Sequence, residues 1–298
     1  MDRLKIVMTL MIILFVAVLP AHGASAKKKT SISVVHETLL TKGNEDIKGL
    51  VLRLPLPSNH KSRAYSQKVT SISVKIDPEP SGMEDISDRA GNSFKKIHWR
   101  SVSGPARVEL SFSASINERP VILKSKAPYP VRVSKRFEAY LTPTAGEKKI
   151  GKKLEEIISE ATQGKRTEMD AVRSILDWVH RNIDYKASSP GTGASYSLSK
   201  GYGNSGGYPN LLVSLLKRSG IPARVVFGLK IMGQSRSHIW AEVYFPDIGW
   251  VPYDPSTKQL AFTSKLIKFT EGPSSGPIIK SWRTSGSKPE YSERTDVN

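Results

Sequence analysis

The chain has 298 residues, no cysteine and a formal net charge of +18. This length allows one large domain or two modest ones, and the lack of cysteine excludes disulfides and thiolate metal sites. The positive charge favours anionic partners such as lipid headgroups, phosphorylated glycans or cell wall. The alternative is that scattered Lys and Arg side chains only keep the protein in solution. The sequence has no nucleic-acid-binding motif, so we expect no nucleic-acid partner.

The first 26 residues have the pattern of a secretory signal peptide. Arg3 and Lys5 precede an apolar run over residues 6–19, which is short for a membrane span, and residues 24–26 fit an A-x-A cleavage site. We therefore predict a signal peptide over residues 1–26 and an exported protein, periplasmic or extracellular, with no transmembrane segment after cleavage. An uncleaved N-terminal anchor is the alternative, and the cleavage site argues against it.

Residues 30–134 are predicted to form a β-rich domain. Apolar and polar residues alternate over residues 31–35, 50–54, 69–76 and 108–114. Prolines and the Asp-Arg-Ala-Gly-Asn segment at residues 88–92 separate these stretches as turns. Several short strands at this spacing are typical of a β-sandwich.

Helical periodicity begins after residue 135. One predicted helix has a face of Ile150, Leu154, Ile157 and Ile158 and ends at Gly164. The next opens at Thr167 in an approximate capping box. We assign Trp178 and His180 on that helix to packing or to the surface. Its expected buried stripe comprises Met169, Val172, Ile175, Leu176, Val179 and Ile183.

A third predicted helix follows a Gly- and Ser-rich run over residues 187–207, which we predict as a loop. Its apolar residues, at 211, 212, 215 and 216, recur at helical spacing, and Gly220 follows as a terminator. Ser205 therefore lies where a loop becomes a helix. Free backbone N–H groups and the positive end of the helix dipole are expected there, and both would stabilise a developing oxyanion.

Two strand-like stretches each carry one polar candidate. His238 opens the stretch at residues 238–244, and Asp254 lies in the stretch at residues 249–256. A nucleophile at a helix start, a base on one strand and an orienting acid on the next form a catalytic triad. The competing interpretations are a structural histidine and a turn aspartate. An antiparallel sheet packed against these helices would make the fold class α+β, with a core domain over residues 135–271. Residues 272–298, rich in Ser, Gly, Pro and charge, are predicted as a flexible tail.

Two local patterns around Ser205 are rejected. Residues 201–206 fit G-x-G-x-x-G, but no strand precedes them and no acid follows about twenty residues later. Residues 203–207 fit the G-x-S-x-G nucleophile elbow, but that fold orders its triad as Ser, acid, His. We predict no cofactor and no metal site, because the histidines form no ligand cluster and no clear acidic calcium loop is present.

The order and spacing of four motifs resemble the bacterial transglutaminase-like proteins, a branch of the papain-like cysteine enzymes. The motifs are GNSGGYPNLL at residues 203–212, GIPAR at 220–224, HIWAEV at 238–243 and GWVPYDPS at 249–256. The resemblance implies a papain-like core after a β-domain, with His238 and Asp254 as base and orienter. In that family the nucleophile is a cysteine, and the matching position here is Ser205. Pro209 likewise replaces an alanine of the family pattern.

Three functional hypotheses follow. A serine hydroxyl does not ionise as a thiol does, so it needs proton removal by His238 and a well-placed oxyanion hole. The leading hypothesis is therefore a catalytically degenerate domain that binds peptide, glycan or a protein partner in the cell envelope. The second is an active acyl-transfer enzyme, an amidase or protease, that uses Ser205, His238 and Asp254. The third is a structural export factor that acts through the β-rich half.

Overall fold

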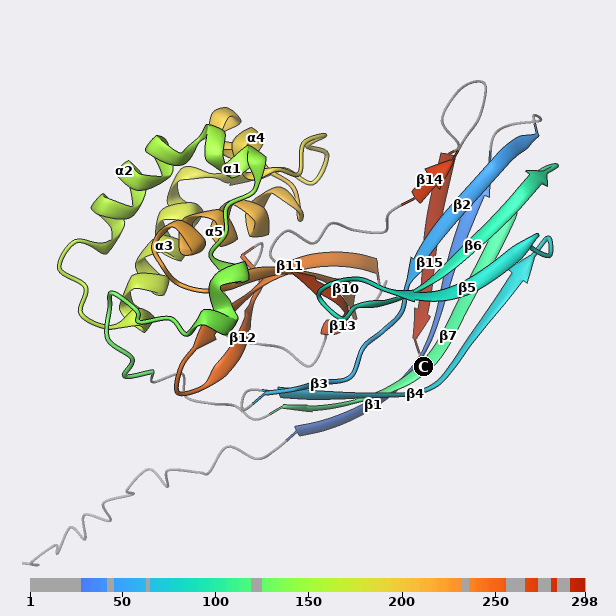
Figure 1. Ribbon diagram of the computed structural model, residues 1–298, viewed down its shortest axis with the longest axis horizontal. Coiled ribbons are helices and arrows are strands. Elements are labelled where there is room, and N and C mark those ends of the chain that lie inside the picture. The colour runs from blue at the N-terminus through green and yellow to red at the C-terminus, as the bar shows by residue number, and fades with distance from the viewer. Residues whose placement is uncertain are drawn as a thin grey trace, which may run out of the picture.

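The computed structural model describes residues 28–41, 46–62, 65–118, 125–231, 236–255, 266–272, 280–282 and 290–297. The predicted signal peptide lies outside these residues. Helices gather at one end of the molecule, two antiparallel sheets form the other, and a third sheet of four strands lies between them (Figure 1). This arrangement confirms the predicted α+β class. Within the described residues, no helix is long and apolar enough to cross a membrane.

Two antiparallel sheets make up the β-rich end of the molecule (Figure 1). Their strand orders are β15-β1-β7-β4-β3 and β14-β2-β6-β5. The strands are β1 (Lys28–Thr41), β2 (Ile47–Pro55), β3 (His60–Lys61), β4 (Tyr65–Asp77), β5 (Gly82–Ser87), β6 (Ser93–Val102), β7 (Ala106–Glu118), β14 (Lys280–Trp282) and β15 (Glu290–Val297).

Strand β7 shows why this half of the sequence could be interpreted in advance. Val108, Leu110 and Phe112 are buried. Ser111 and Ser113, on either side of Phe112, are half-buried. The period of two places the apolar residues on one face of the sheet. The buried residues of β7 share one core with those of β2 and β6 in the second sheet. Strand β5 was not predicted, because its residues are exposed or half-buried throughout and give no alternating apolar pattern.

The helices are η1 (Lys135–Tyr140), α1 (Ala145–Lys149), α2 (Gly151–Thr162), α3 (Glu168–Asn182), α4 (Ala194–Lys200) and α5 (Gly207–Arg218). The capping role of Thr167 is confirmed, because its side chain accepts a hydrogen bond from Asp170 N at 3.2 Å. Every residue of the predicted stripe of α3 is buried. Gly164 follows α2 with φ of 71°, a backbone conformation that glycine adopts without strain.

Helix α4 corrects the prediction of a loop over residues 187–207. Its sequence, ASYSLSK, has no apolar period, and Ala194 and Ser197 are its only buried residues. The helix ends at Gly201, which has φ of 71°. Tertiary packing rather than periodicity therefore fixes this helix, and a pattern-based interpretation has no means of finding it.

The sheet between the two ends has the order β12-β11-β10-β13. Its strands are β10 (Ala223–Lys230), β11 (Arg236–Phe245), β12 (Gly249–Tyr253) and β13 (Leu266–Gly272), all paired antiparallel. Helix α5 packs against β10 and β11. A short parallel pair, β8 (Asp184–Tyr185) and β9 (Tyr202–Gly203), precedes α5.

The C-terminal segment differs from the flexible tail that the sequence predicted. Residues 290–297 form β15, which pairs with β1 from Val34↔Val297 to Thr41↔Glu290. Lys280–Trp282 pairs with β2. The composition of the tail gives no apolar stripe, and its pairing partners lie some 250 residues earlier, as the register shows. A local pattern does not report such distant pairing.

A buried group of charges joins the β-rich end to the middle sheet. We call it the junction cluster and define it as Tyr65, Arg224, Glu242, Lys268 and Glu271. Tyr65 donates its hydroxyl hydrogen to Glu242 Oε1 at 2.6 Å, and Lys268 Nζ lies 2.8 Å from Glu242 Oε2. Arg224 Nε donates to the same oxygen at 2.7 Å and also pairs with Glu271. Strands β4, β10, β11 and β13 are thereby tied together through side chains.

Candidate functional site

His238 and Asp254 meet at one end of the middle sheet. His238 lies on β11, and Asp254 follows β12 directly. The register of β11 and β12 pairs Ala241 with Tyr253, which brings Asp254 to the level of Trp240, two residues from His238. His238 Nε2 lies 2.9 Å from Asp254 Oδ2, and the two side chains are 8% and 11% exposed. The Nδ1 atom of His238 is then the ring nitrogen that could exchange a proton with another group.

Gly228 stands opposite His238 for a steric reason. A Cβ atom at this position would lie 1.8 Å from the carbonyl oxygen of Ile267 and 2.8 Å from the ring of Trp240. The register between β10 and β13 shifts at this point, between Phe227 and Gly228. The absence of a side chain at residue 228 therefore lets β13 approach the strand that faces His238.

Lys230 is a member of this site that sequence reasoning missed. Its Nζ lies 2.6 Å from Asp254 Oδ2, the oxygen that also contacts His238. It is the last residue of β10, two positions beyond Gly228, and so lies on the same face of the sheet as His238. The period of two along β10 was the available signal, but the pairing of β10 with β11 was needed to interpret it.

His180 supports the backbone beside Asp254. Its Nε2 donates a hydrogen bond to the carbonyl oxygen of Pro255 at 3.0 Å. This contact ties helix α3 to the segment that carries the carboxylate. His180 was predicted to have a packing or surface role. The structure shows a half-buried side chain that holds the backbone just after Asp254.

Ser205 is half-buried in the turn before α5, in agreement with its predicted location. Within the residues that the structure describes, no hydrogen bond joins Ser205 to His238. The structure therefore brings His238 and Asp254 into contact and leaves the catalytic role of Ser205 a prediction. A serine hydrolase needs its hydroxyl within hydrogen-bonding reach of the histidine, although such contacts often lengthen when substrate is absent.

The start of helix α5 differs from the expected set of free N–H groups. Asn204 Oδ1 accepts hydrogen bonds from Gly206 N at 2.9 Å and from Gly207 N at 3.0 Å. Tyr208 N donates to the carbonyl oxygen of Asn204 at 3.2 Å, and Pro209 has no N–H group. The side chain of residue 204 thus caps the helix, and donors expected to face an oxyanion are already occupied.

Tyrosine and lysine side chains flank this turn. Strand β9 ends two residues before Ser205. Strand β8 runs parallel to it and places Tyr185 beside Gly203. Tyr185 is 49% exposed, and Lys186 Nζ lies 4.8 Å from the centre of the Tyr202 ring. Aromatic faces with a nearby cation suit contact with a peptide or a sugar ring.

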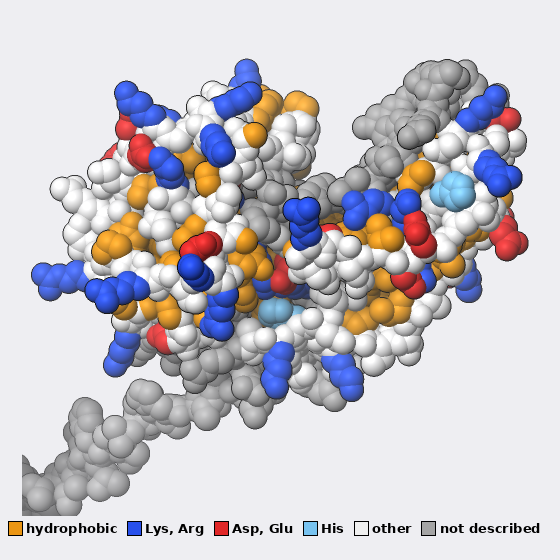
Figure 2. Space-filling model, in the orientation of Figure 1, with side chains coloured by type: hydrophobic (Ala, Val, Ile, Leu, Met, Phe, Trp, Pro, Cys, Tyr) orange, Lys and Arg blue, Asp and Glu red, His pale blue; other side chains and the backbone are white. Residues whose placement is uncertain are grey.

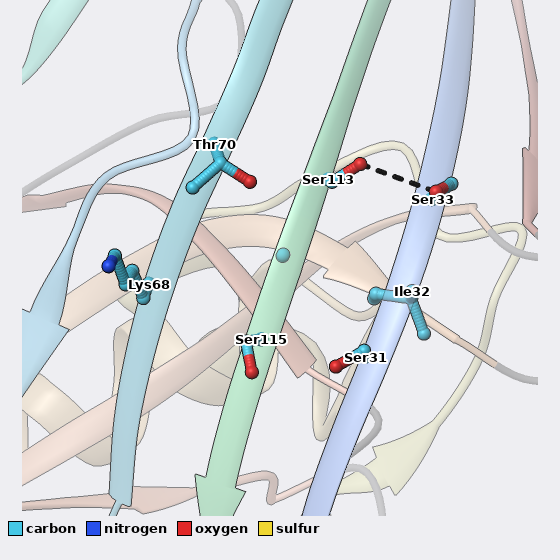
Figure 3. Close-up of a pocket in the computed structure, with 8 residues that line it drawn as sticks. Ser31, Ile32, Ser33, Lys68, Thr70, Ser113 and Ser115 are labelled. Carbon is cyan, nitrogen blue, oxygen red and sulfur yellow. Dashed lines mark hydrogen bonds between the residues drawn. The ribbon is translucent and has the colours of Figure 1, made fainter.

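A separate hollow lies on the outer face of the β1-β7-β4 sheet (Figure 3). It measures about 390 Å³, and the hydroxyls of Ser33 and Ser113 lie 3.3 Å apart within it. Its lining contains no carboxylate and no histidine, so it offers neither a general base nor a triad. The lining residues are Ser31, Ile32, Ser33, Lys68, Thr70, Ser113, Ala114 and Ser115.

The wider surface adds two observations. On the face shown in Figure 2, Lys and Arg side chains are spread over both ends of the molecule rather than collected in one patch. Within the described ranges, no three His, Cys, Asp or Glu side chains gather as metal ligands.

Comparison with known proteins relates this geometry to a family. Residues 155–255 match the family model of the transglutaminase-like superfamily. This segment contains all three predicted site residues. A search of curated proteins finds no match.

Comparison with solved structures relates the fold as a whole. A candidate cysteine protease from Cytophaga hutchinsonii is similar over 92% of this chain and 92% of its own, with a TM-score of 0.68 and 14% identity, which shows a shared fold. A structure described as a TGase matches 62% of this chain and 47% of its own at 14% identity, with a TM-score of 0.31. A candidate protease from Parabacteroides distasonis matches 70% and 43% at 14% identity, with a TM-score of 0.29. The last two scores carry no structural argument.

Proposed function

We propose that the protein is exported and uses the domain around residues 155–255, the segment that matches the transglutaminase-like family model, to bind a ligand without turning it over. The ligand is a peptide, a glycan or a protein partner of the cell envelope. One observation supports the proposal: the chain has no cysteine, and the order of the motifs aligns Ser205 with the nucleophilic cysteine of the family.

The surroundings of Ser205 support a degenerate site. A serine nucleophile depends on proton removal by a histidine and on donors aimed at the oxyanion. In the part of the chain that the structure describes, His238 is hydrogen-bonded to Asp254 and no hydrogen bond joins it to Ser205, and Asn204 occupies the N–H groups of Gly206 and Gly207. The described hydrogen bonds around residue 205 therefore support a binding role for this site over activation of the serine hydroxyl.

One observation favours an active enzyme as the second candidate. The His238–Asp254 contact of 2.9 Å is the orienting half of a triad. In that case Ser205 Oγ would attack the carbonyl carbon of an acyl donor, and His238 would take the hydroxyl proton and pass it to the leaving amine. Water would then release the acyl group from Ser205.

Fluorophosphonate labelling of the native protein, measured by intact mass, separates these candidates. We expect no adduct on Ser205, while a Ser205→Cys variant reacts with a thiol electrophile in a manner that requires His238. A single adduct on native Ser205 that disappears in His238→Ala would overturn the binding proposal and establish a serine acyl-transfer enzyme.

Export has its own test. The N-terminus of the protein recovered from its native cell should lie just after the A-x-A site, at Lys27. Recovery of the protein from the cytoplasm with residues 1–26 still attached would overturn export and leave the binding proposal to be judged on the labelling experiment alone.

A further inference from the structure

We propose that Lys230 is a positioning residue that restrains the base at this site: by sharing the carboxylate of Asp254, it reduces the ability of His238 to activate whatever side chain stands at residue 205. The inference takes from the proposed function only that residue 205 occupies the nucleophile position.

The contact geometry is the first support. Lys230 Nζ and His238 Nε2 lie 2.6 Å and 2.9 Å from one and the same atom, Asp254 Oδ2. The three side chains are 17%, 8% and 11% exposed. Because water has little access to them, the ammonium group and the imidazole compete for one carboxylate oxygen in a partly desolvated setting.

The backbone fixes this competition. Gly228 pairs with His238 across β10 and β11, and Lys230 follows two residues later on the same face. The approach of Ile267 allows only glycine at position 228, so β13 lies close against β10 at this point. Lys230 is therefore directed toward Asp254 by the sheet rather than by a chance rotamer of a surface side chain.

The consequence is electrostatic. When a histidine accepts a proton, the charge of its orienting carboxylate stabilises the imidazolium that forms. An ammonium group on the same oxygen offsets that negative charge, so the carboxylate stabilises the imidazolium of His238 less during proton transfer. A thiolate–imidazolium pair, the reactive form of a cysteine site, would be weakened in the same way.

The charged groups named below on α3, β10, β11 and β13 have partners of their own, and on β15 Glu293 accepts a hydrogen bond from Ser237 Oγ at 2.7 Å. On α3, His180 bonds to the carbonyl oxygen of Pro255. On β10, β11 and β13, the charged side chains of the junction cluster pair with one another: Arg224, Glu242, Lys268 and Glu271. Lys230 is thus the cation that the described structure places directly on the carboxylate of the candidate triad.

The lack of native cysteine makes the inference directly measurable. In a Ser205→Cys protein every thiol adduct reports on residue 205 alone. The experiment compares the rate of alkylation by iodoacetamide between pH 5 and 8.5, measured by intact mass. The parent is Ser205→Cys, and the second substitutions are Lys230→Met, Lys230→Gln, Lys230→Arg, His238→Ala and, as a matched exposed lysine, Lys200→Met.

We expect Lys230→Met and Lys230→Gln each to raise the alkylation rate at pH 6 about tenfold and to move the rate profile toward acid, because the carboxylate of Asp254 then acts on the imidazolium alone. Lys230→Arg keeps the charge and should stay within about twofold of the parent, as should Lys200→Met. Thermal unfolding of each variant identifies any that do not fold, and Lys230→Gln keeps a hydrogen-bond donor in case Lys230→Met fails.

The inference is overturned if Lys230→Gln folds and reacts no faster than the parent while His238→Ala still slows the reaction. It is also overturned if Lys230→Arg accelerates alkylation as much as Lys230→Met, because loss of shape rather than of charge would then be the cause. Neither result bears on fluorophosphonate labelling of native Ser205, which remains the independent test of the proposed function.

Discussion

Two groups of charged side chains lie along strand β11, and they differ in how their charges are balanced. Glu242 in the junction cluster is fully buried and contacts Arg224, Lys268 and Tyr65. Near the other end of the strand, His238 and Lys230 share Asp254, and the three side chains are 8–17% exposed. The first group joins two parts of the fold, whereas the second lies in the candidate site.

Some residues of the four sequence motifs stabilise the fold and do not belong to the candidate site. Arg224 belongs to the GIPAR motif and Glu242 to the HIWAEV motif, yet both are occupied in the buried cluster. Burial alone would raise the pKa of Glu242, but the charges of Lys268 and Arg224 outweigh burial and hold that pKa well below its usual range. The charged residues of these two motifs therefore anchor the sheet, whichever side chain stands at residue 205.

The largest effect is expected from removing the centre of the junction cluster. Glu242→Ala leaves Arg224 and Lys268 buried without their shared partner, which should lower the free energy of unfolding by about 3–5 kcal/mol. Urea unfolding measures the change, with Glu242→Gln as a second variant if the alanine variant does not fold. A loss below about 1 kcal/mol in a folded variant would show that the cluster relaxes or admits water.

A smaller effect should follow from removing one hydroxyl at the same cluster. Tyr65→Phe deletes the 2.6 Å hydrogen bond to Glu242 Oε1 and keeps the ring, which stacks with His60 at 4.4 Å. A hydrogen bond to a buried charged group is worth about 1.5–3 kcal/mol, so we expect a loss in that range by urea unfolding. Unchanged stability would mean that the two cations alone satisfy Glu242.

The buried carboxyl of Glu168 should lower the stability of the protein, whereas the paired carboxylate of Glu242 raises it. Both carboxyl oxygens of Glu168 are buried without a hydrogen bond in the described structure, and burial, with a contribution from Asp247, raises its pKa from 4.5 to about 8. The folded protein therefore holds a proton that the unfolded chain releases, so stability falls as pH rises from about 4.5 to about 8.

Glu168→Gln removes this titration and should stabilise the protein. A pKa raised from 4.5 to about 8 corresponds to a gain of about 4 kcal/mol near pH 8 that shrinks toward zero near pH 4.5, measured by thermal unfolding across that range. Glu160→Gln on the exposed face of α2 serves as the matched control. A gain that does not depend on pH would contradict the assigned titration.

The smallest effect is expected at an exposed ion pair of the β-rich end. Lys96 Nζ lies 2.5 Å from Glu84 Oε1, but the two side chains are 42% and 57% exposed. Solvent screening limits such pairs, so Glu84→Gln should change the free energy of unfolding by less than about 0.5 kcal/mol. A change as large as that of Tyr65→Phe would show that burial does not explain why the junction cluster contributes more to stability than this exposed pair.

The sequence by itself determined the parts of this protein that depend on local periodicity. The alternation along β7 and the stripe of α3 predicted their buried faces, because a regular backbone directs every second or every third to fourth side chain to one side. The order of the four motifs predicted the domain that the comparisons support and placed Ser205 at the start of a helix.

The tertiary structure decided what depends on distant partners. The pairing of β15 with β1 and the cap that Asn204 gives to α5 leave no periodic trace. The contact of Lys230 with Asp254 follows from the period of β10 only once the pairing of β10 with β11 is known. Each arises from groups that the fold brings together, such as β10 and the end of β12, whose register is fixed only after β11 pairs between them. Local pattern thus identified the candidate residues, and long-range pairing determined which charges they face.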